Sequence, residues 1–139
     1  MNKGIVIKTN GKVESVTVDG LKEMQDIVGG YIECALGGDG WDLWANEEGR
    51  LIGLPMNMVA MKFVAKMSGS DFNQVLSLHG DFLLLGHDGE GGTNDCPKVI
   101  ADKAISMAMF DEPRAFFVEG EKMNEEIDRA FFVEGENNG

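Results

Sequence analysis

Basic residues are scarce in this chain of 139 residues, and none of them forms a cluster. The chain has 12 Lys and Arg against 24 Asp and Glu, a formal net charge of −12, and the basic positions are scattered from Lys3 to Arg129. Such a charge repels nucleic-acid phosphates, so we expect no direct nucleic-acid binding. An acidic surface still suits a basic protein partner, although acidity that only keeps the chain soluble is the simpler explanation.

Cysteine and long apolar runs are also scarce. Cys34 and Cys96 are too few for a disulfide framework, and neither belongs to a Cys-x-x-Cys pair, which predicts two reduced thiols. The N-terminal apolar run, Ile5 to Ile7, is far shorter than the apolar region of a signal peptide. Nothing approaches the ~20 apolar residues of a membrane span. We therefore expect a cytoplasmic protein with no membrane partner.

Turn residues and hydrophobic spacing divide the first 110 residues into hairpins and helices. The segments "GIVIKTNGKVESVTV", "YIECALGGDGWDLWANEE" and "FNQVLSLHGDFLLLG" each predict a strand pair, joined at Asn10-Gly11, at "GGDG" and at His79-Gly80. Helical spacing predicts helices at 21–28, from Pro55 to about Met67, and from Pro97 to about Phe110. Asp19 is expected to cap the first of these helices, and Gly29-Gly30 supplies a residue able to take the left-handed conformation that ends it. The expected fold is a single α+β domain, residues 1–110, with a mostly antiparallel sheet and three packed helices.

The remaining residues, 111–139, contain a duplication. The octapeptide "RAFFVEGE" occurs at Arg114–Glu121 and again at Arg129–Glu136. Two copies are too few for a solenoid, and replication slippage explains them without any function. The alternative is a tail that docks on a partner or a neighbouring protomer, because its aromatic rings would form a costly patch in water. This alternative predicts a homo-oligomer, with contacts through Phe116, Phe117, Phe131 and Phe132.

The stretch "NEEGRLIGLPMN", residues 46–57, has two interpretations. In the first it is architecture: Asn46 and Gly49 bracket a reverse turn, and Leu54 before Pro55 ends a strand ahead of a helix. In the second it borders a small-ligand or nucleotide pocket, because rings stack on bases and arginine pairs with phosphate. The side chains predicted to form that pocket are Tyr31, Trp44, Asn46, Arg50 and Asn57.

Several motifs in this part of the chain resemble a small family of uncharacterised domains that is common in bacteriophages and mobile elements. They are "VGGYIE", the "NEEG" turn, the "GLPxN" step and the paired strands toward "FLLLG", and the resemblance covers about Val18 to Gly86. The family has no established catalytic residues, so the resemblance implies a genetic setting rather than a chemistry. A small acidic phage protein of this kind often acts in the host cytoplasm by blocking host machinery.

Histidines, carboxylates and thiols offer little sign of catalysis. His79, Asp81, His87, Asp88 and Glu90 match no metal-ligand spacing, and the glycine-rich loop around them would hold ligands loosely, so no metal or cofactor is expected. A Cys96 nucleophile with His79 or His87 as its base is the one enzymatic alternative. Cys34 lies in an apolar strand and is expected to be a small buried hydrophobe.

Three functional hypotheses remain open after the sequence analysis. The first is a non-enzymatic phage-type protein that sequesters a host-defence component such as a nucleotide immune signal. The second is an acidic inhibitor that docks on a basic host protein, imitating nucleic acid. The third is a small enzyme that uses His79, His87 or Cys96.

Overall fold

An antiparallel sheet forms the centre of the computed structural model, which describes residues 1–111 and the side chains of residues 1–108. Five strands follow the order β2-β1-β5-β4-β3, and a short sixth strand pairs with β5. Every strand pairing is antiparallel. The strands are β1 (Asn2–Ile7), β2 (Val13–Val18), β3 (Ile32–Gly38), β4 (Trp41–Asn46), β5 (Phe82–His87) and β6 (Thr93–Asn94).

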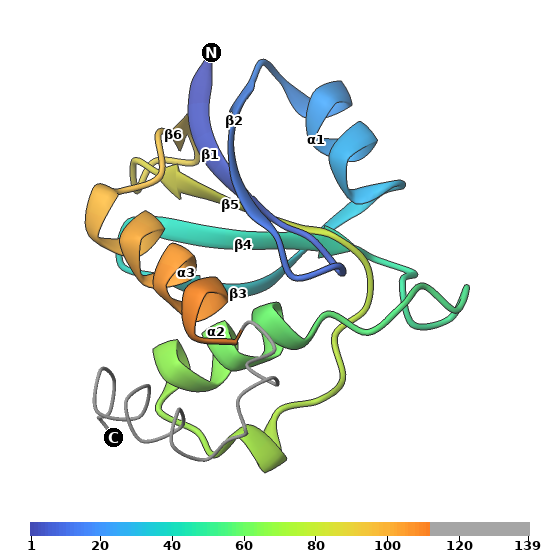
Figure 1. Ribbon diagram of the computed structural model, residues 1–139. Helices are drawn as coiled ribbons and strands as arrows, with labels where there is room; N and C mark the ends of the chain where they lie inside the picture. Colours follow the sequence, from blue (N-terminus) through green and yellow to red (C-terminus); the bar gives the residue numbers. More distant parts are fainter. Residues whose placement is uncertain (112–139) are drawn as a thin grey trace. The chain divides into compact units, whose positions relative to one another are not determined.

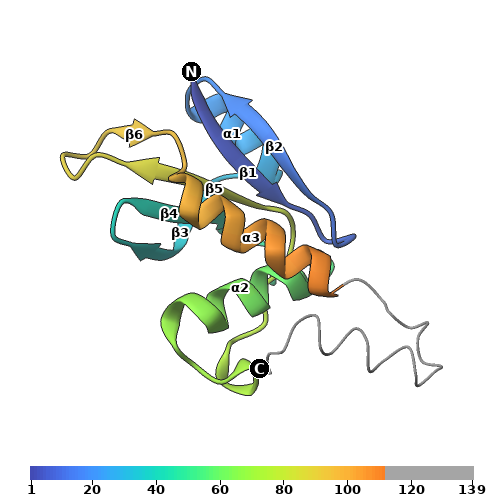
Figure 2. The same cartoon turned by 60° about the vertical axis from the view of Figure 1, so that its left-hand side comes forward.

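Helices cover both faces of this sheet (Figure 1, Figure 2). Helix α1 (Leu21–Val28) packs on one face, which we call the α1 face, and α2 (Met58–Ser68) and α3 (Lys98–Asp111) pack on the other. The central strand β5 supplies Phe82 and Leu84 to the α2–α3 side and alternate leucines to the α1 face, all of them buried. Burial on both sides explains the uninterrupted apolar run "FLLL". The predicted α+β fold is thus confirmed.

The first hairpin forms as predicted, but its connection differs. Ile7 pairs with Val13, so residues 8–12 make the connection. The Gly11 N–H donates to the Lys8 carbonyl at 2.9 Å, which puts Thr9 and Asn10 at the centre of the turn and Gly11, with φ 91°, after it. The prediction of a two-residue turn centred on Asn10-Gly11 is therefore wrong, although Gly11 still supplies a positive φ.

The third predicted strand pair is half wrong. "FLLLGH" is β5, whereas the preceding segment contains a 3₁₀-helix, Phe72–Gln74, and then an extended stretch with a single bridge between Met56 and His79. The glycine-rich loop, predicted without regular structure, includes the two-residue β6. Asp71 caps the 3₁₀-helix, with its backbone N–H held by the Gln74 side chain at 3.2 Å. Local capping chemistry outweighs the apolar alternation that predicted a strand.

The predicted starts of two helices also shift. Helix α1 has Gly20 at its N-cap in place of Asp19, and it ends as predicted at a left-handed Gly29. Helix α2 begins at Met58, capped by Asn57, rather than at Pro55. Along residues 1–111, no helix is both long and apolar enough to cross a membrane.

Candidate functional site

Asn57 is a structural residue. Its side chain is fully buried; its Oδ1 accepts from the Ala60 N–H at 2.9 Å, and its Nδ2 donates to the Ile7 and Gly80 carbonyls, each at 2.9 Å. One amide thereby caps α2 and ties that helix to β1 and to the entrance of β5. Asn57 therefore does not reach a surface pocket as predicted, because the side chain is buried in the core with its Oδ1 and both Nδ2 hydrogens in hydrogen bonds.

Asn46 also has a structural role, at the end of β4. Only 6% of it is exposed; its Nδ2 donates to the Val28 carbonyl at 3.2 Å, and its Oδ1 accepts from the Glu48 N–H at 2.7 Å. A side chain at Gly30 would place its Cβ 2.8 Å from Asn46 Nδ2. Gly30, the second glycine of "VGGYIE", therefore allows the segment after α1 to approach this amide closely.

The loop that follows, residues 47–54, folds on itself. The Gly49 N–H donates to the Asn46 carbonyl at 3.1 Å, the Ile52 N–H to the Glu48 carbonyl at 2.9 Å, and the Leu54 N–H back to the Gly49 carbonyl at 2.9 Å. Gly49 itself is buried. These bonds make the 47–54 loop a defined structure rather than an open connection.

His79 holds this loop from the other side. Its Nδ1 lies 2.7 Å from the Leu54 carbonyl and its Nε2 3.0 Å from Ser77 Oγ. Because a carbonyl only accepts, Nδ1 carries the proton and the Ser77 hydroxyl donates to Nε2. Both ring nitrogens are engaged in hydrogen bonds, so His79 ties the Leu54 end of the loop to Ser77.

The tip of the 47–54 loop presents apolar side chains to solvent. Leu51 is 82% exposed and Ile52 is 56% exposed. Leu76, 72% exposed, lines a cleft together with Leu51, and Tyr31, 70% exposed, lines another together with Ile52. Exposed apolar residues that gather on one surface are a sign of an interaction site. Leu51 and Ile52 are not among the predicted site residues, although turn residues on both sides of the pair (Gly49 and Gly53) could have revealed a loop tip.

Two clefts flank this loop. The Arg50 cleft, about 750 Å³, lies between the loop and the segment 76–79, and the Tyr31 cleft, about 510 Å³, lies between the loop and the end of α1. Asn46 borders both. Arg50 is exposed and its Nη2 donates to the Ser77 carbonyl at 3.2 Å.

Carboxylates outnumber cations in both clefts. Glu33 and Glu47 line the Arg50 cleft, where Arg50 is the only Lys or Arg among the lining residues. Asp26 and Glu48 line the Tyr31 cleft, which has no lining Lys or Arg. Both clefts are therefore more favourable to a cationic group than to a phosphate.

The five predicted ligand residues do not form one pocket. Arg50 and Tyr31 lie in separate clefts that share Asn46, Trp44 lines a third cleft on the α1 face, and Asn57 is buried elsewhere. In the stretch "NEEGRLIGLPMN", Asn46 and Asn57 thus have structural roles, and the loop between them exposes its apolar tip.

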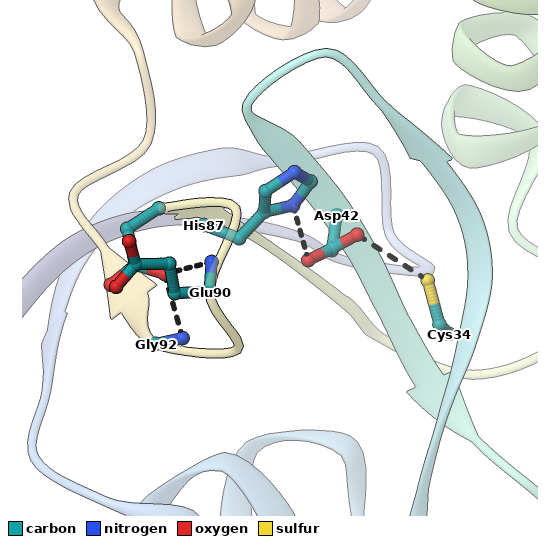
Figure 3. A network of polar contacts seen from close by, with 6 residues as sticks. Cys34, Asp42, His87, Glu90 and Gly92 are labelled. Carbon is teal, nitrogen blue, oxygen red and sulfur yellow. Dashed lines mark hydrogen bonds and ion pairs between the residues drawn. The ribbon is translucent and has the colours of Figure 1, made fainter.

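His87 belongs to a different polar network, on β3, β4 and β5 (Figure 3). Its Nδ1 lies 2.8 Å from Asp42 Oδ2, and the Cys34 thiol donates to Asp42 Oδ1 at 3.7 Å. Partial desolvation by the neighbouring residues, the Asp42 charge and this hydrogen bond raise the pKa of the Cys34 thiol. The carboxylate stands between thiol and imidazole, and the thiol stays protonated, so the arrangement lacks a nucleophile activated by a base.

The surroundings of the two cysteines also differ from those of a reactive thiol. Cys34 is exposed on the edge strand β3, so its expected burial is wrong. Cys96 is partly buried against the core, and burial raises its pKa to about 11. Within residues 1–108 no group of three or more His, Cys, Asp or Glu side chains is arranged to hold a metal ion.

The glycine-rich loop after β5 is organised by one carboxylate. Asp88 Oδ1 accepts from the Glu90 and Gly92 N–H groups, each at 2.8 Å, and these bonds lower the Asp88 pKa (Figure 3). These bonds make residues 88–92 a local turn. The phenylalanines predicted to bind a partner, Phe116, Phe117, Phe131 and Phe132, lie outside the residues that the structure describes.

Comparison with known proteins identifies one family. The family model named "Domain of unknown function (DUF3846)" matches residues 1–108. No curated protein and no solved structure matches the chain. The matched range contains the 47–54 loop and the clefts lined by Arg50, by Tyr31 and by Trp44.

Proposed function

The chain belongs to the DUF3846 family, whose function is unknown, and we propose that its domain is a protein-binding module that docks a basic partner on the 47–54 loop. The observation that carries this proposal is the exposure of Leu51 and Ile52, 82% and 56%, at the tip of a loop whose backbone is hydrogen-bonded internally. Leaving both in water forgoes about 1.5–3 kcal/mol of burial per side chain, which a partner surface would recover.

The loop is preorganised for such a contact. Asn46 fixes its start, His79 holds Leu54 at its end, and the backbone bonds between them leave little conformational freedom to lose. Rigid presentation lowers the entropic cost of association. The clefts on either side provide room for partner side chains next to the apolar tip.

Charge indicates the chemistry of the partner. Four carboxylates, Asp26, Glu33, Glu47 and Glu48, border the clefts against the single Arg50. An apolar centre with an acidic rim complements a hydrophobic patch surrounded by Lys or Arg. Nucleotide sequestration, the first hypothesis from the sequence, fits this surface less well, because a phosphate would meet more anions than cations.

A role in counter-defence is the biological setting that we propose for this binding. The support is the net charge of −12 together with the sequence resemblance to phage domains. An acidic domain that covers a basic host surface would compete with whatever anion that surface normally binds, including nucleic acid.

Affinity capture with three matched baits tests the proposal. The baits are the wild-type chain, a Leu51→Ser/Ile52→Ser double variant and a Val99→Ser variant, which changes an equally exposed apolar side chain on α3 (Val99 is 61% exposed). We expect a basic protein that the wild type and Val99→Ser capture equally and that the double variant loses by tenfold or more, about 1.4 kcal/mol. Its measured affinity should fall as salt rises. Equal loss in both variants, or binding that salt does not weaken, contradicts the proposal.

A further inference from the structure

The third cleft lies on the α1 face, away from the 47–54 loop. It has a volume of about 300 Å³ and is bounded by α1, by β4 and β5, and by the loop ahead of β6. We name it the Trp44 cleft, because the partly buried ring of Trp44 forms one wall.

The lining of the Trp44 cleft differs from that of the other two clefts. Leu85, Val18 and Met24 are buried, with 0%, 2% and 7% exposed, and provide an apolar floor beside the indole. None of the lining residues is charged. In a chain with a net charge of −12, an uncharged cavity is a local exception that needs its own explanation.

Polar groups occur only toward the outside. Asn2 and Thr93, which are more exposed than the floor residues, bring an amide and a hydroxyl to the cleft. Gly20 and Gly91, with φ 97° and 92°, border it without side chains, so their backbone is not shielded. An apolar floor, one aromatic wall and a few hydrogen-bonding groups make up the usual composition of a small-molecule site.

The geometry points to binding of a single uncharged heteroaromatic ring system with a polar edge, of which a nucleobase is the simplest example. We infer that such a ring stacks on Trp44 while its edge reaches Asn2 or Thr93. The volume lies near the lower limit of about 300 Å³ for ligand sites, which suits one ring system and not a dinucleotide. A phosphate would find no lining cation, so the charged form of the same ligand should bind worse.

Adenosine and AMP are the probes for this inference, since they differ by the phosphate alone. Trp44 reports binding by fluorescence, whereas the second indole, Trp41, is buried on the other face against Phe63, with ring centroids 5.6 Å apart. We expect saturable quenching by adenosine and at least tenfold weaker binding of AMP. Equilibrium dialysis should give the same order and should show at least fivefold weaker adenosine binding to Trp44→Leu.

A variant at the exposed rim of the cleft tests ligand binding without the risk that the substitution unfolds the domain. Leu21 borders the cleft and is 56% exposed, so Leu21→Lys introduces a cation without disturbing the core. This variant should narrow the gap between AMP and adenosine, while Leu51→Ser should leave adenosine binding unchanged. Non-saturable quenching, equal affinity of the two probes for the wild type, or an unchanged gap in Leu21→Lys overturns the inference. Because the 47–54 loop takes no part, these results stand apart from the proposed protein binding.

Discussion

Replacing Asn57 by alanine should be among the most destabilising single changes in the domain. The side chain is fully buried and makes three hydrogen bonds of 2.9 Å. Loss of the helix cap costs about 1 kcal/mol. The Ile7 and Gly80 carbonyls each lose a donor in the interior, at about 1–3 kcal/mol apiece where no other donor replaces it. We expect a total of about 3–7 kcal/mol, a large share of the 5–15 kcal/mol typical of a domain.

Urea denaturation followed by circular dichroism measures this loss, with Arg50→Ala as the control. Arg50 is exposed and makes one bond to the Ser77 carbonyl, so its removal should cost about 0.5 kcal/mol or less. Asn57→Asp keeps the capping oxygen but turns a second carboxylate oxygen toward two carbonyls, and it should be no more stable than Asn57→Ala. A loss below about 1 kcal/mol for Asn57→Ala would refute the reasoning, since the cap alone accounts for that much.

Three further changes test other parts of the account. Gly49→Ala should lower the urea midpoint, because its Cβ would lie 2.8 Å from the His79 carbonyl oxygen; an unchanged midpoint would mean that the loop yields easily. The Cys96 pKa is raised from 9.0 to about 11 in the folded chain, so the folded state holds this proton more tightly and stability should fall as pH rises from about 9 to 11. Cys96→Ala should remove that part of the pH dependence, and an identical profile for both proteins would contradict it. Deleting residues 112–139, or changing Phe116, Phe117, Phe131 and Phe132 to Ser, should lower the mass measured by light scattering if the tail mediates assembly; a wild type that is already monomeric rules this out.

Much of the fold follows from local sequence signals. The "FLLLG" segment predicted a strand and forms β5, and the alternating segments around "GGDG" predicted the hairpin of β3 and β4. Gly29 ends α1 in the left-handed conformation that its position predicted. These signals depend on neighbouring residues only, which is why they survive in the folded chain.

The wrong predictions concern residues whose surroundings are set by contacts with distant parts of the chain. Asn57 makes its three bonds to residues as far apart as Ile7 and Gly80, so its burial depends on how α2 crosses the sheet. No local pattern contains that information. Trp44 and Arg50 are near in sequence, yet they border different clefts because alternate strand residues point to opposite faces and the loop turns away. The sequence predicted that Tyr31, Trp44, Asn46 and Arg50 share one pocket, whereas these residues border three separate clefts.

The structure assigns the polar and the apolar residues of "NEEGRLIGLPMN" roles opposite to those that the sequence suggested. Its conspicuous polar residues, Asn46 and Asn57, satisfy buried backbone groups, whereas the inconspicuous Leu51 and Ile52 face solvent. Composition alone would place the asparagines at the surface and the leucine and isoleucine in the core. Exposed apolar residues on a rigid loop become visible only when the hydrogen bonds of the loop are known.

The most direct test of the proposed function is the dissociation constant of the captured basic partner, measured against the wild type and against Leu51→Ser/Ile52→Ser. The proposal predicts at least tenfold weaker binding by the double variant, with an unchanged urea midpoint because both side chains are exposed. Val99→Ser should bind like the wild type. Equal dissociation constants for the wild type and the double variant would contradict the proposal and leave the 47–54 loop as architecture alone.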